Sequence, residues 1–395
     1  MKINNNLRTG GLYTKRPYMM QIEEKGKLDY ITKFDYFLMG TVLMISLIGL
    51  VFLEGAMENM YLDGGKSAML VQIVGLAAGV VIAIAFSFAD YYLFRVFSWP
   101  FYAFNVVMML SVFTPLGIEQ YGSRAWINIG ITTYQPSELM KLAMVLVIAQ
   151  QIEYIEKEGG MTVKRGAIIL GSFLLPLGLV FLQKDIGQSM VFIFVFLVTI
   201  FIGGINKKYI FTIIGTGMLA VHFVWKFAMN DARRGRLLSF MDPDKYLDYS
   251  YQLRRTIMAI GSGRLTGEGI GEGTMNMGKK IPVKMSDSIF AVIGEEAGFI
   301  GCLIVVILMT VMLGRMIFIS YKARETFGKC VAAGIFAMFA FNIIENIGMN
   351  IGIMPITGLP LPFVSKGGSS MITNYMAIGV LLSISTRRQR GFFSD

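Results

Sequence analysis

MSDSIFAVIGEE, residues 285–296, joins a polar stretch to an apolar block that continues to position 319. This block is long enough to cross roughly 30 Å of hydrocarbon as a helix. Asp287 stands at its mouth, and Glu295 and Glu296 lie inside it. Carboxylates are costly at such positions, so their presence predicts that the protein uses them.

The rest of the chain repeats this apolar pattern. Of its 395 residues, 54% are hydrophobic and 16% are charged, which predicts an all-α polytopic membrane protein with ten transmembrane helices. The expected membrane domain, 36–386, lies between tails at 1–35 and 387–395. Its expected spans are 36–53, 68–88, 91–114, 136–152, 166–182, 188–205, 209–229, 289–319, 328–351 and 371–386.

Lys and Arg residues predict the orientation, because short loops that carry them stay in the cytoplasm. Both tails are basic, as are the loops after the fourth, sixth and eighth expected helices, so the N- and C-termini are expected in the cytoplasm. Segment 230–287 is also basic, but loops approaching this length translocate with less regard for charge. It is therefore the expected large outer loop between helices 7 and 8, and it ends at Asp287.

Other features argue against some classes of site. The glycine-rich segment 261–273 lacks the strand that precedes a dinucleotide fingerprint, so it is expected to be flexible and tightly turning. His222 has no Cys partners for a metal site. The net charge of +10 lies on the topogenic residues and the outer loop, which favours an anionic lipid headgroup as partner. Neither a nucleic acid nor an organic cofactor is expected.

Four polar clusters fall on the outer side in this topology. In the first, Arg124 and Trp126 suit a phosphate and the adjoining lipid or sugar. Glu138 and Lys141 follow, three residues apart on one helix face. They either belong to the site or form an ion pair that lowers the cost of burial. The second cluster, 183–188, contains Asp185 and is either part of the site or only a tight turn between two helices.

The third cluster is the Asp287 segment, where the alternative is a helix N-cap. Eight residues separate Asp287 from Glu295, roughly 12 Å along a helix axis and about 80° around it, so the two cannot share a proton. The fourth cluster, 346–370, holds three prolines within eight residues, which excludes a regular helix. Irregular backbone at membrane depth predicts the wall of a cavity.

With these clusters, the chain resembles the SEDS family (shape, elongation, division and sporulation) over nearly all of residues 30–390. The most specific matches are QPSEL at 135–139, FAVIGEE at 290–296 and the run 346–370. The chain departs from the family pattern beside the aspartate, where Met285-Ser286 and Ser288 replace His-Thr and Phe. It also has Lys184 where Pro is usual and Lys366 where Tyr is usual.

The resemblance implies an enzyme that polymerises glycan strands from lipid II at the outer face of the bacterial cytoplasmic (inner) membrane, releasing undecaprenyl diphosphate. Asp287 matches the essential aspartate of the family and is expected to be the catalytic base. The residues expected to bind substrate and diphosphate are Arg124, Trp126, Lys141, Lys184 and Ser369. The residues expected to support the site or bind a cation are Glu138, Asp185, Glu295, Glu296 and Asn350.

A divalent cation, Mg²⁺ or Mn²⁺, is expected on Asp185 or Glu295. The expected partner is a class B penicillin-binding protein, a single-span transpeptidase. Two alternatives remain open: a transporter that moves lipid II across the membrane, and a catalytically silent scaffold for the transpeptidase. The resemblance does not distinguish elongation, division and sporulation.

Overall fold

The computed structural model describes residues 33–57, 65–120, 122–130, 133–223, 226, 231–278 and 280–387. The chain divides into two units, Met1–Phe34 and Asp35–Asp395. Of the first unit only Lys33 and Phe34 are described. Most of the expected N-terminal tail, and positions 388–395 of the expected C-terminal tail, therefore lie outside the described residues. The fold and the candidate site belong to the second unit.

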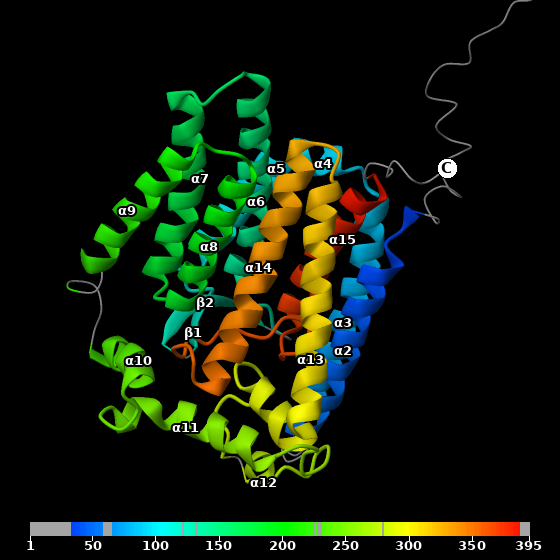
Figure 1. Cartoon of the computed structure of the whole chain (residues 1–395), viewed down its shortest axis with the longest axis vertical. Helices are drawn as coiled ribbons and strands as arrows, with labels where there is room; N and C mark the ends of the chain where they lie inside the picture. Colours follow the sequence, from blue (N-terminus) through cyan, green and yellow to red (C-terminus); the bar gives the residue numbers. More distant parts are fainter. Residues whose placement is uncertain are drawn as a thin grey trace, which may run out of the picture. The chain divides into compact units, whose positions relative to one another are not determined.

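The second unit is mostly helical (Figure 1). Its longer helices are α2 (Tyr36–Met57), α3 (Gly65–Phe88), α5 (Ser98–Ser111), α6 (Pro136–Lys157), α7 (Val163–Leu182), α8 (Ile186–Ile202), α9 (Lys207–Phe223), α13 (Ile289–Lys322), α14 (Thr326–Ile351) and α15 (Gly368–Thr386). The others are α4 (Tyr91–Val96), α10 (Asp231–Met241), α11 (Leu247–Ser262) and α12 (Thr274–Met277).

Five of the described helices are long and apolar enough to cross a membrane, namely α2, α3 from Ala68, α7, α13 and α14. The chain is thus a multi-pass membrane protein. Helix α8 is apolar but shorter, and α6 carries the charged residues Glu138, Lys141 and Glu153 on its buried faces. The expectation of ten spanning helices is therefore supported for five, and the full number and the orientation stay predictions.

One expected span, 91–114, is divided. Helix α4 ends at Val96 and α5 begins at Ser98. Pro100 lies in the first turn of α5 and has no amide hydrogen for the Val96 carbonyl. The neighbouring Arg95 carbonyl accepts from the Ser98 hydroxyl and from the Gln150 side chain, both at 2.9 Å. The break follows from this proline, which the apolar pattern alone did not take into account.

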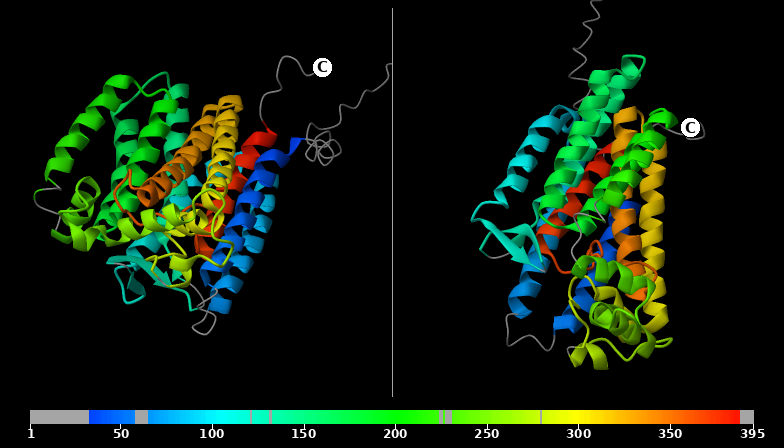
Figure 2. Two further views of the ribbon diagram at one scale, coloured as in Figure 1. Left: turned by 60° about the horizontal axis from the view of Figure 1, so that its bottom comes forward. Right: turned by 90° about the vertical axis from the view of Figure 1, so that its left-hand side faces the viewer.

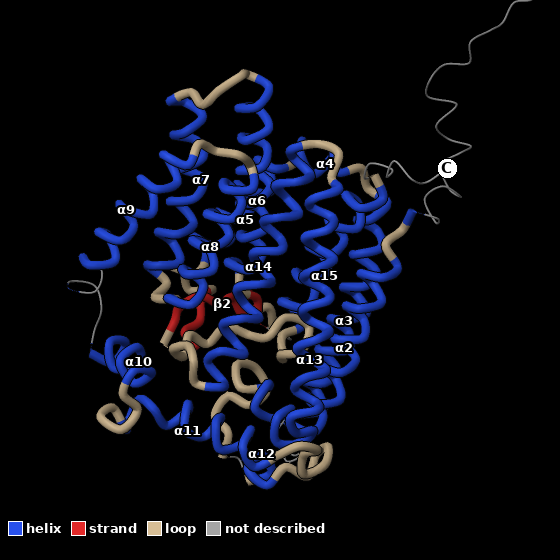
Figure 3. The backbone as a smooth tube through the Cα atoms, in the orientation of Figure 1, coloured by secondary structure: helices blue, strands red, loops and turns tan. Residues whose placement is uncertain are grey.

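The expectation of an all-α fold is wrong at one place, a three-stranded antiparallel sheet (Figure 3). Its strands are β1 (Gly117–Gln120), β2 (Ser123–Asn128) and β3 (Thr133–Tyr134), in the order β1-β2-β3. Gly122, at a φ of 80°, occupies the turn between β1 and β2, a conformation that suits glycine. Along β2, buried Ala125 and Ile127 alternate with exposed Arg124 and Asn128, so the strand presents Arg124 on its open face.

Helix α6 forms the centre of the bundle. It is buried along most of its length and packs against α5, α7, α8 and α14 (Figures 1 and 2). At another contact α3 lies along α15. A Cβ on Gly75 would stand 2.9 Å from the Cα of Gly368, and one on Gly379 would stand 2.9 Å from the Cα of Ala83. Small residues at these positions let the two backbones approach closely.

Two expected loops contain more helix than anticipated. Segment 230–287 holds α10, α11 and α12, and α11 packs on α13 and α14 (Figure 2). The irregular segment is shorter than 346–370, because α14 continues to Ile351 and α15 begins at Gly368. Consequently Asn350 belongs to α14, Ser369 belongs to the first turn of α15, and the irregular backbone between them covers positions 352–367.

Candidate active site

Asp287 lies in a turn directly before α13 and is half-buried. Its backbone carbonyl accepts hydrogen bonds from the side-chain amides of Asn346 and Asn350, both at 2.9 Å. The carbonyl of Ser286 accepts from the Ser365 hydroxyl at 2.6 Å. Because α14 and the irregular segment hold this backbone, the Asp287 turn has little freedom to move.

The irregular segment also approaches the Asp287 carboxylate. The Lys366 amide donates to the Met285 carbonyl at 2.8 Å. A Cβ on Gly358, which has a φ of 76°, would lie 3.3 Å from Oδ2 of Asp287. Segment 352–367 thus packs beside the Asp287 carboxylate. This agrees with the expectation that the irregular segment lines a cavity.

Asp185 lies in the turn between α7 and α8, as expected, and is the N-cap of α8. Its Oδ1 accepts from the Gln188 amide at 3.0 Å, and its Oδ2 accepts from the Gln135 side chain at 3.0 Å. The residue is half-buried and close enough to Asp287 for the two carboxylates to interact electrostatically. Two loops that are about a hundred positions apart in the sequence therefore meet at this pair.

Burial is the main cause of the altered acidity of both carboxyl groups. It raises the pKa of Asp287 to about 7, and the charge of Asp185 adds to this while a hydrogen bond with Ser286 opposes it. Burial likewise raises the pKa of Asp185 to about 6; the Gln188 amide opposes this and the charge of Glu138 adds to it. At neutral pH Asp287 is then divided between its acid and base forms, as a proton-transfer group requires.

Glu138 and Lys141 form an ion pair, which was one of the two alternatives that their spacing left open. Oε1 of Glu138 accepts from Lys141 Nζ at 2.9 Å and from the Gln188 side chain at 2.6 Å. Glu138 is 4% exposed and Lys141 is fully buried. The charge of Lys141 is thus paired within the protein, where it stabilises the buried Glu138. Glu138 in turn accepts from Gln188 and so contacts the start of α8.

Other cations near this centre are exposed. The Arg124 backbone amide donates to the Gln183 carbonyl at 3.1 Å, which ties β2 to the turn that precedes Asp185. Arg124 and Lys184 both present their side chains to the surface, and Trp126 is half-buried on the same strand as Arg124. Ser369 is tied to the sheet, since its hydroxyl donates to the Thr133 carbonyl at 3.0 Å.

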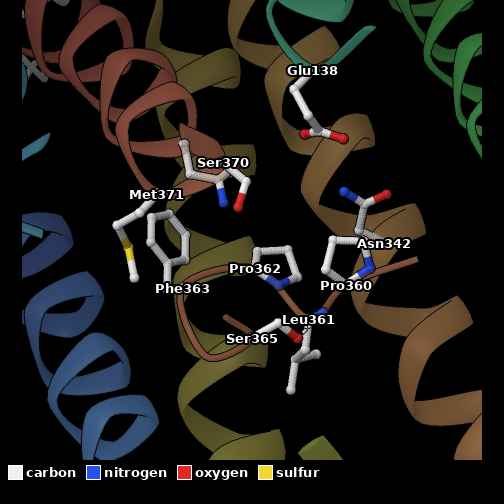
Figure 4. A pocket seen from close by; sticks show the side chains of 10 residues that line it. Glu138, Asn342, Pro360, Leu361, Pro362, Phe363, Ser365, Ser370 and Met371 are labelled. Atoms are coloured by element: carbon white, nitrogen blue, oxygen red, sulfur yellow. Dashed lines mark hydrogen bonds between the residues drawn. The ribbon is translucent and has the colours of Figure 1, made fainter. Parts of the chain in front are cut away.

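A small cavity adjoins this group of residues (Figure 4). It measures about 10 Å³, roughly the room that one water molecule needs. Glu138 lies on one side of it and Pro360 and Pro362 lie on the other, while Asn342 lies beside Pro360 with its amide toward Glu138. Oδ1 of Asn342 is buried without a hydrogen-bond partner, so a bound water would satisfy it.

Glu295 and Glu296 are placed elsewhere. Both oxygens of Glu295 accept backbone amides, from Met275 at 2.5 Å and Asn276 at 3.0 Å. Oε1 of Glu296 accepts from the Asn276 side chain at 2.6 Å. Within the described ranges, no three or more His, Cys, Asp or Glu side chains gather as metal ligands. Both carboxylate oxygens of Glu295 are thus engaged by backbone amides, so Asp185 is the better placed of the two alternative cation ligands.

Three residues that organise the site were assigned no role in it from the sequence, namely Gln135, Gln188 and Asn346. All three lie within stretches that the sequence singled out, at 135–139, 183–188 and 346–370. Two of them carried a readable signal. Asn346 and Asn350 are four apart in an apolar helix, so they share a face. Gln188 is three residues after an N-cap aspartate, where its amide is the expected hydrogen-bond donor. The contact of Gln135 with Asp185 joins two distant segments and has no local signal.

Comparisons with known proteins agree on one family. The family model described as cell cycle protein, comprising FtsW, RodA and SpoVE, matches residues 35–390. The peptidoglycan glycosyltransferase MrdB of Escherichia coli K12 is 30% identical over 88% of this chain and 94% of its own length. Stage V sporulation protein E of Bacillus subtilis 168 is 33% identical over 80% of this chain and 86% of its own.

Solved structures show the same fold. A chain from a peptidoglycan synthase complex, described as coordinating polymerization and crosslinking, has a TM-score of 0.74 and 26% identity, and the match covers 89% of this chain and 97% of that one. The rod shape determining protein RodA of Thermus thermophilus has a TM-score of 0.67 and 25% identity, over 91% of this chain and 98% of its own. This chain belongs to the FtsW, RodA and SpoVE family of cell cycle proteins.

Proposed function

We propose that this protein is a peptidoglycan glycosyltransferase that polymerises lipid II into glycan strands at the outer face of the bacterial cytoplasmic membrane. The observation that carries the proposal is the Asp287 turn, in which a carboxylate with a raised pKa is held in place at the mouth of a spanning helix. The relatives named as peptidoglycan glycosyltransferases support this reaction class over a transporter or a silent scaffold.

In this proposal Asp287 is the general base. Its carboxylate takes the proton from the 4-hydroxyl of the acceptor's N-acetylglucosamine as that oxygen bonds to the anomeric carbon of the donor's N-acetylmuramic acid. The bond from this carbon to the diphosphate breaks, and its electron pair leaves with undecaprenyl diphosphate. Attack from the opposite face converts an α-linkage into a β-linkage. A base with a pKa near the working pH is the most effective for such a step.

The leaving diphosphate needs positive charge. Arg124 and Lys184 supply it in this proposal, because both are exposed and flank the turn that carries Asp185. Arginine forks bind phosphate oxygens well, and the Trp126 ring beside Arg124 offers an apolar surface for lipid or sugar. Lys141 acts indirectly, since its charge is already paired with Glu138. Ser369 and Asn350 hold the surrounding backbone.

In this proposal a divalent cation would bind at Asp185. Asp185 and Asp287 repel each other electrostatically, and a cation beside Asp185 would relieve that repulsion. When bound, Mg²⁺ or Mn²⁺ would help to neutralise the diphosphate.

The proposed partner is a class B penicillin-binding protein. The similar chain from the synthase complex comes from an assembly that couples polymerization to crosslinking, and this supports the proposal.

The proposal is tested with the purified protein and labelled lipid II in detergent, analysed for glycan chains on a gel. Reactions contain Mg²⁺, Mn²⁺ or a chelator, with and without the transpeptidase. We expect glycan chains, fewer of them after chelation, and recovery when Mg²⁺ or Mn²⁺ is restored. Chains made without a membrane barrier exclude a pure transporter. An absence of chains in every combination would contradict the proposed function.

A further inference from the structure

Helix α13 is interrupted at Gly298, whose φ of 63° and ψ of −161° are not helical. In an unbroken helix the amides of Phe299 and Ile300 would donate to the carbonyls of Glu295 and Glu296. The break separates these four groups inside a spanning helix, where backbone groups without partners are costly.

Residues 264–269 of the glycine-rich segment supply the missing partners. The Phe299 amide donates to the Arg264 carbonyl at 2.9 Å, and the Ile300 amide donates to the Leu265 carbonyl at 3.1 Å. In the other direction, the amides of Glu268 and Gly269 donate to the carbonyls of Glu295 and Glu296 at 2.9 and 3.0 Å. The segment is thus inserted into the break.

The glycines of this segment permit the insertion. A Cβ on Gly263 would overlap the carbonyl oxygen of Gly294, and a Cβ on Gly267 would overlap that of Glu296. Close approach of two backbones is what requires glycine here. The expectation that segment 261–273 is flexible is therefore wrong, because its backbone is bonded into α13.

Asn276, which is 1% exposed, connects this region to Asp287. Its amide donates to Glu295 Oε2 at 3.0 Å, and its side chain donates to Glu296 Oε1 at 2.6 Å and to the Gly55 carbonyl of α2 at 3.1 Å. Lys284 Nζ donates to the side-chain oxygen and the backbone carbonyl of Asn276, at 2.5 and 2.9 Å. We call Asn276, Lys284, Glu295 and Glu296 the Asn276 clamp.

The Asn276 clamp includes residues that precede Asp287 in the sequence and residues that follow it. Lys284 lies three residues before it, and Glu295 lies eight residues after it, on the short half of α13 that begins at Ile289. We infer that the Asn276 clamp, together with the inserted segment, positions Asp287 for proton transfer, and that Glu295 and Glu296 are positioning residues for the proposed reaction. This inference rests on the proposed function.

A positioning role follows from the contacts that hold the Asp287 turn in place. The side chains of Asn346 and Asn350 hold it from one side, and the clamp fixes the two chain ends that lead into it. If the clamp is loosened, the half-helix can shift relative to α14, and the carboxylate moves with it. A displacement of about 1 Å can cost on the order of 10²-fold in rate.

The test compares Asn276→Ala and Lys284→Met with Glu272→Gln, which alters an exposed carboxylate on the same segment. We expect the two clamp variants to lose kcat on the order of 10–100-fold, with little change in the KM for lipid II. We also expect the acid limb of their pH–rate profiles to move to lower pH, because a loosened Asp287 is better hydrated while Asp185 still faces it. A merely structural role would reduce the amount of folded enzyme and leave the profile unchanged.

Amide hydrogen exchange tests the Asn276 clamp independently of any measurement of enzyme activity. In the wild-type protein we expect protection of the Glu268, Gly269, Phe299 and Ile300 amides. In Asn276→Ala we expect faster exchange across 263–300 and unchanged exchange in 326–351. Unprotected amides in the wild type, or normal kcat and pH profiles in both clamp variants, would overturn the inference. Protected amides in a protein that makes no glycan would count against the proposed function instead.

Discussion

The acidity of Asp287 gives a prediction at the scale of a single residue. Burial and the charge of Asp185 raise the pKa of Asp287 to about 7, so the base form is scarce in acid and accumulates as the pH rises. At one unit below the pKa only about a tenth of the groups is ionised. We expect kcat to rise with pH through about pH 7 and then level off, measured as the rate of glycan formation in detergent.

The Asp185 contribution is testable in the same assay. In reactions that contain the chelator, no cation neutralises Asp185, and Asp185→Asn then removes the neighbouring negative charge. The residual activity should therefore show its acid limb at lower pH than the wild type under the same conditions. A rate that stays flat from one unit below pH 7 to one unit above it would show that Asp287 does not titrate in the rate-limiting step.

Lys184 provides a second prediction at this scale. Its φ is 66°, a left-handed conformation that costs an L-residue roughly 1–2 kcal/mol and costs glycine little. We expect Lys184→Gly to raise the melting temperature in detergent relative to Lys184→Ala, which removes the same side chain but keeps the strain. Lys184→Pro should lower the melting temperature, because proline cannot adopt a positive φ. We expect it to reduce the free energy of unfolding by more than about 1 kcal/mol.

This residue also explains a departure from the family pattern. Proline is usual at this position, yet the backbone conformation of this chain excludes it. A proline variant as stable as the wild type would show that the turn before Asp185 adopts another conformation.

At the scale of elements, segment 352–367 is predicted to act on Asp287 through close contact. Gly358→Ala would introduce a Cβ 3.3 Å from the Asp287 carboxylate at a φ of 76°. We expect a loss of activity on the order of tenfold or more, because the carboxylate must move. Gly159→Ala is the matched control, since Gly159 has a φ of 77° and open space around it. Equal activity losses in the two variants would assign the effect to backbone strain.

The sequence was informative where a local rule applies. Apolar length predicted the long helices, and the three-residue spacing indicated the pair of Glu138 with Lys141 as one of two alternatives. Turn composition likewise predicted that Asp185 precedes a helix. Each of these depends on neighbours within one or two helical turns, so no tertiary contact was needed to see it.

Other features depend on contacts between distant segments, which a single sequence does not reveal. The break in α13 exists because residues 264–269 replace its lost hydrogen bonds, and nothing in FAVIGEE indicates such a partner. Glu295 was one of two alternatives for a cation ligand, and its hydrogen-bond partners are amides about 20 positions upstream, which the sequence did not indicate. The small sheet has strands of two to six residues, too short for the alternation of side chains to stand out.

At the scale of the whole chain, charge separates the two ends of α6. Its first turn carries Glu138 in the Asp185 and Asp287 region, and its last turns carry Glu153 and Lys157, roughly 20–30 Å farther along the helix axis. There Arg95 and Lys157 pair with Glu153 at 2.8 and 2.9 Å. Both ends hold paired charges, since Glu138 likewise pairs with Lys141. Only the first end also carries Asp185 and Asp287, which favours a reaction centre there over a continuous path through the protein.

The expected topology gives a prediction at this scale. Cysteines introduced as Glu272→Cys and Lys157→Cys, after Cys302 and Cys330 are replaced by Ser, occupy exposed positions at opposite ends of the bundle. We expect a membrane-impermeant maleimide to label Glu272→Cys in intact cells and Lys157→Cys only after the membrane is opened. Labelling of Lys157→Cys alone in intact cells would place Asp287 on the cytoplasmic side and contradict the proposed use of lipid II at the outer face.

The rate of the Asp287→Asn variant shows whether Asp287 is the base for glycan polymerisation. Asp287→Asn keeps the size of the side chain, and the bonds from Asn346 and Asn350 go to the backbone carbonyl, so the turn should survive. With equal amounts of folded protein and labelled lipid II in detergent, we predict that the variant loses about 10²–10⁴-fold in rate. Wild-type rates of polymerisation by the correctly folded Asn variant would contradict the account.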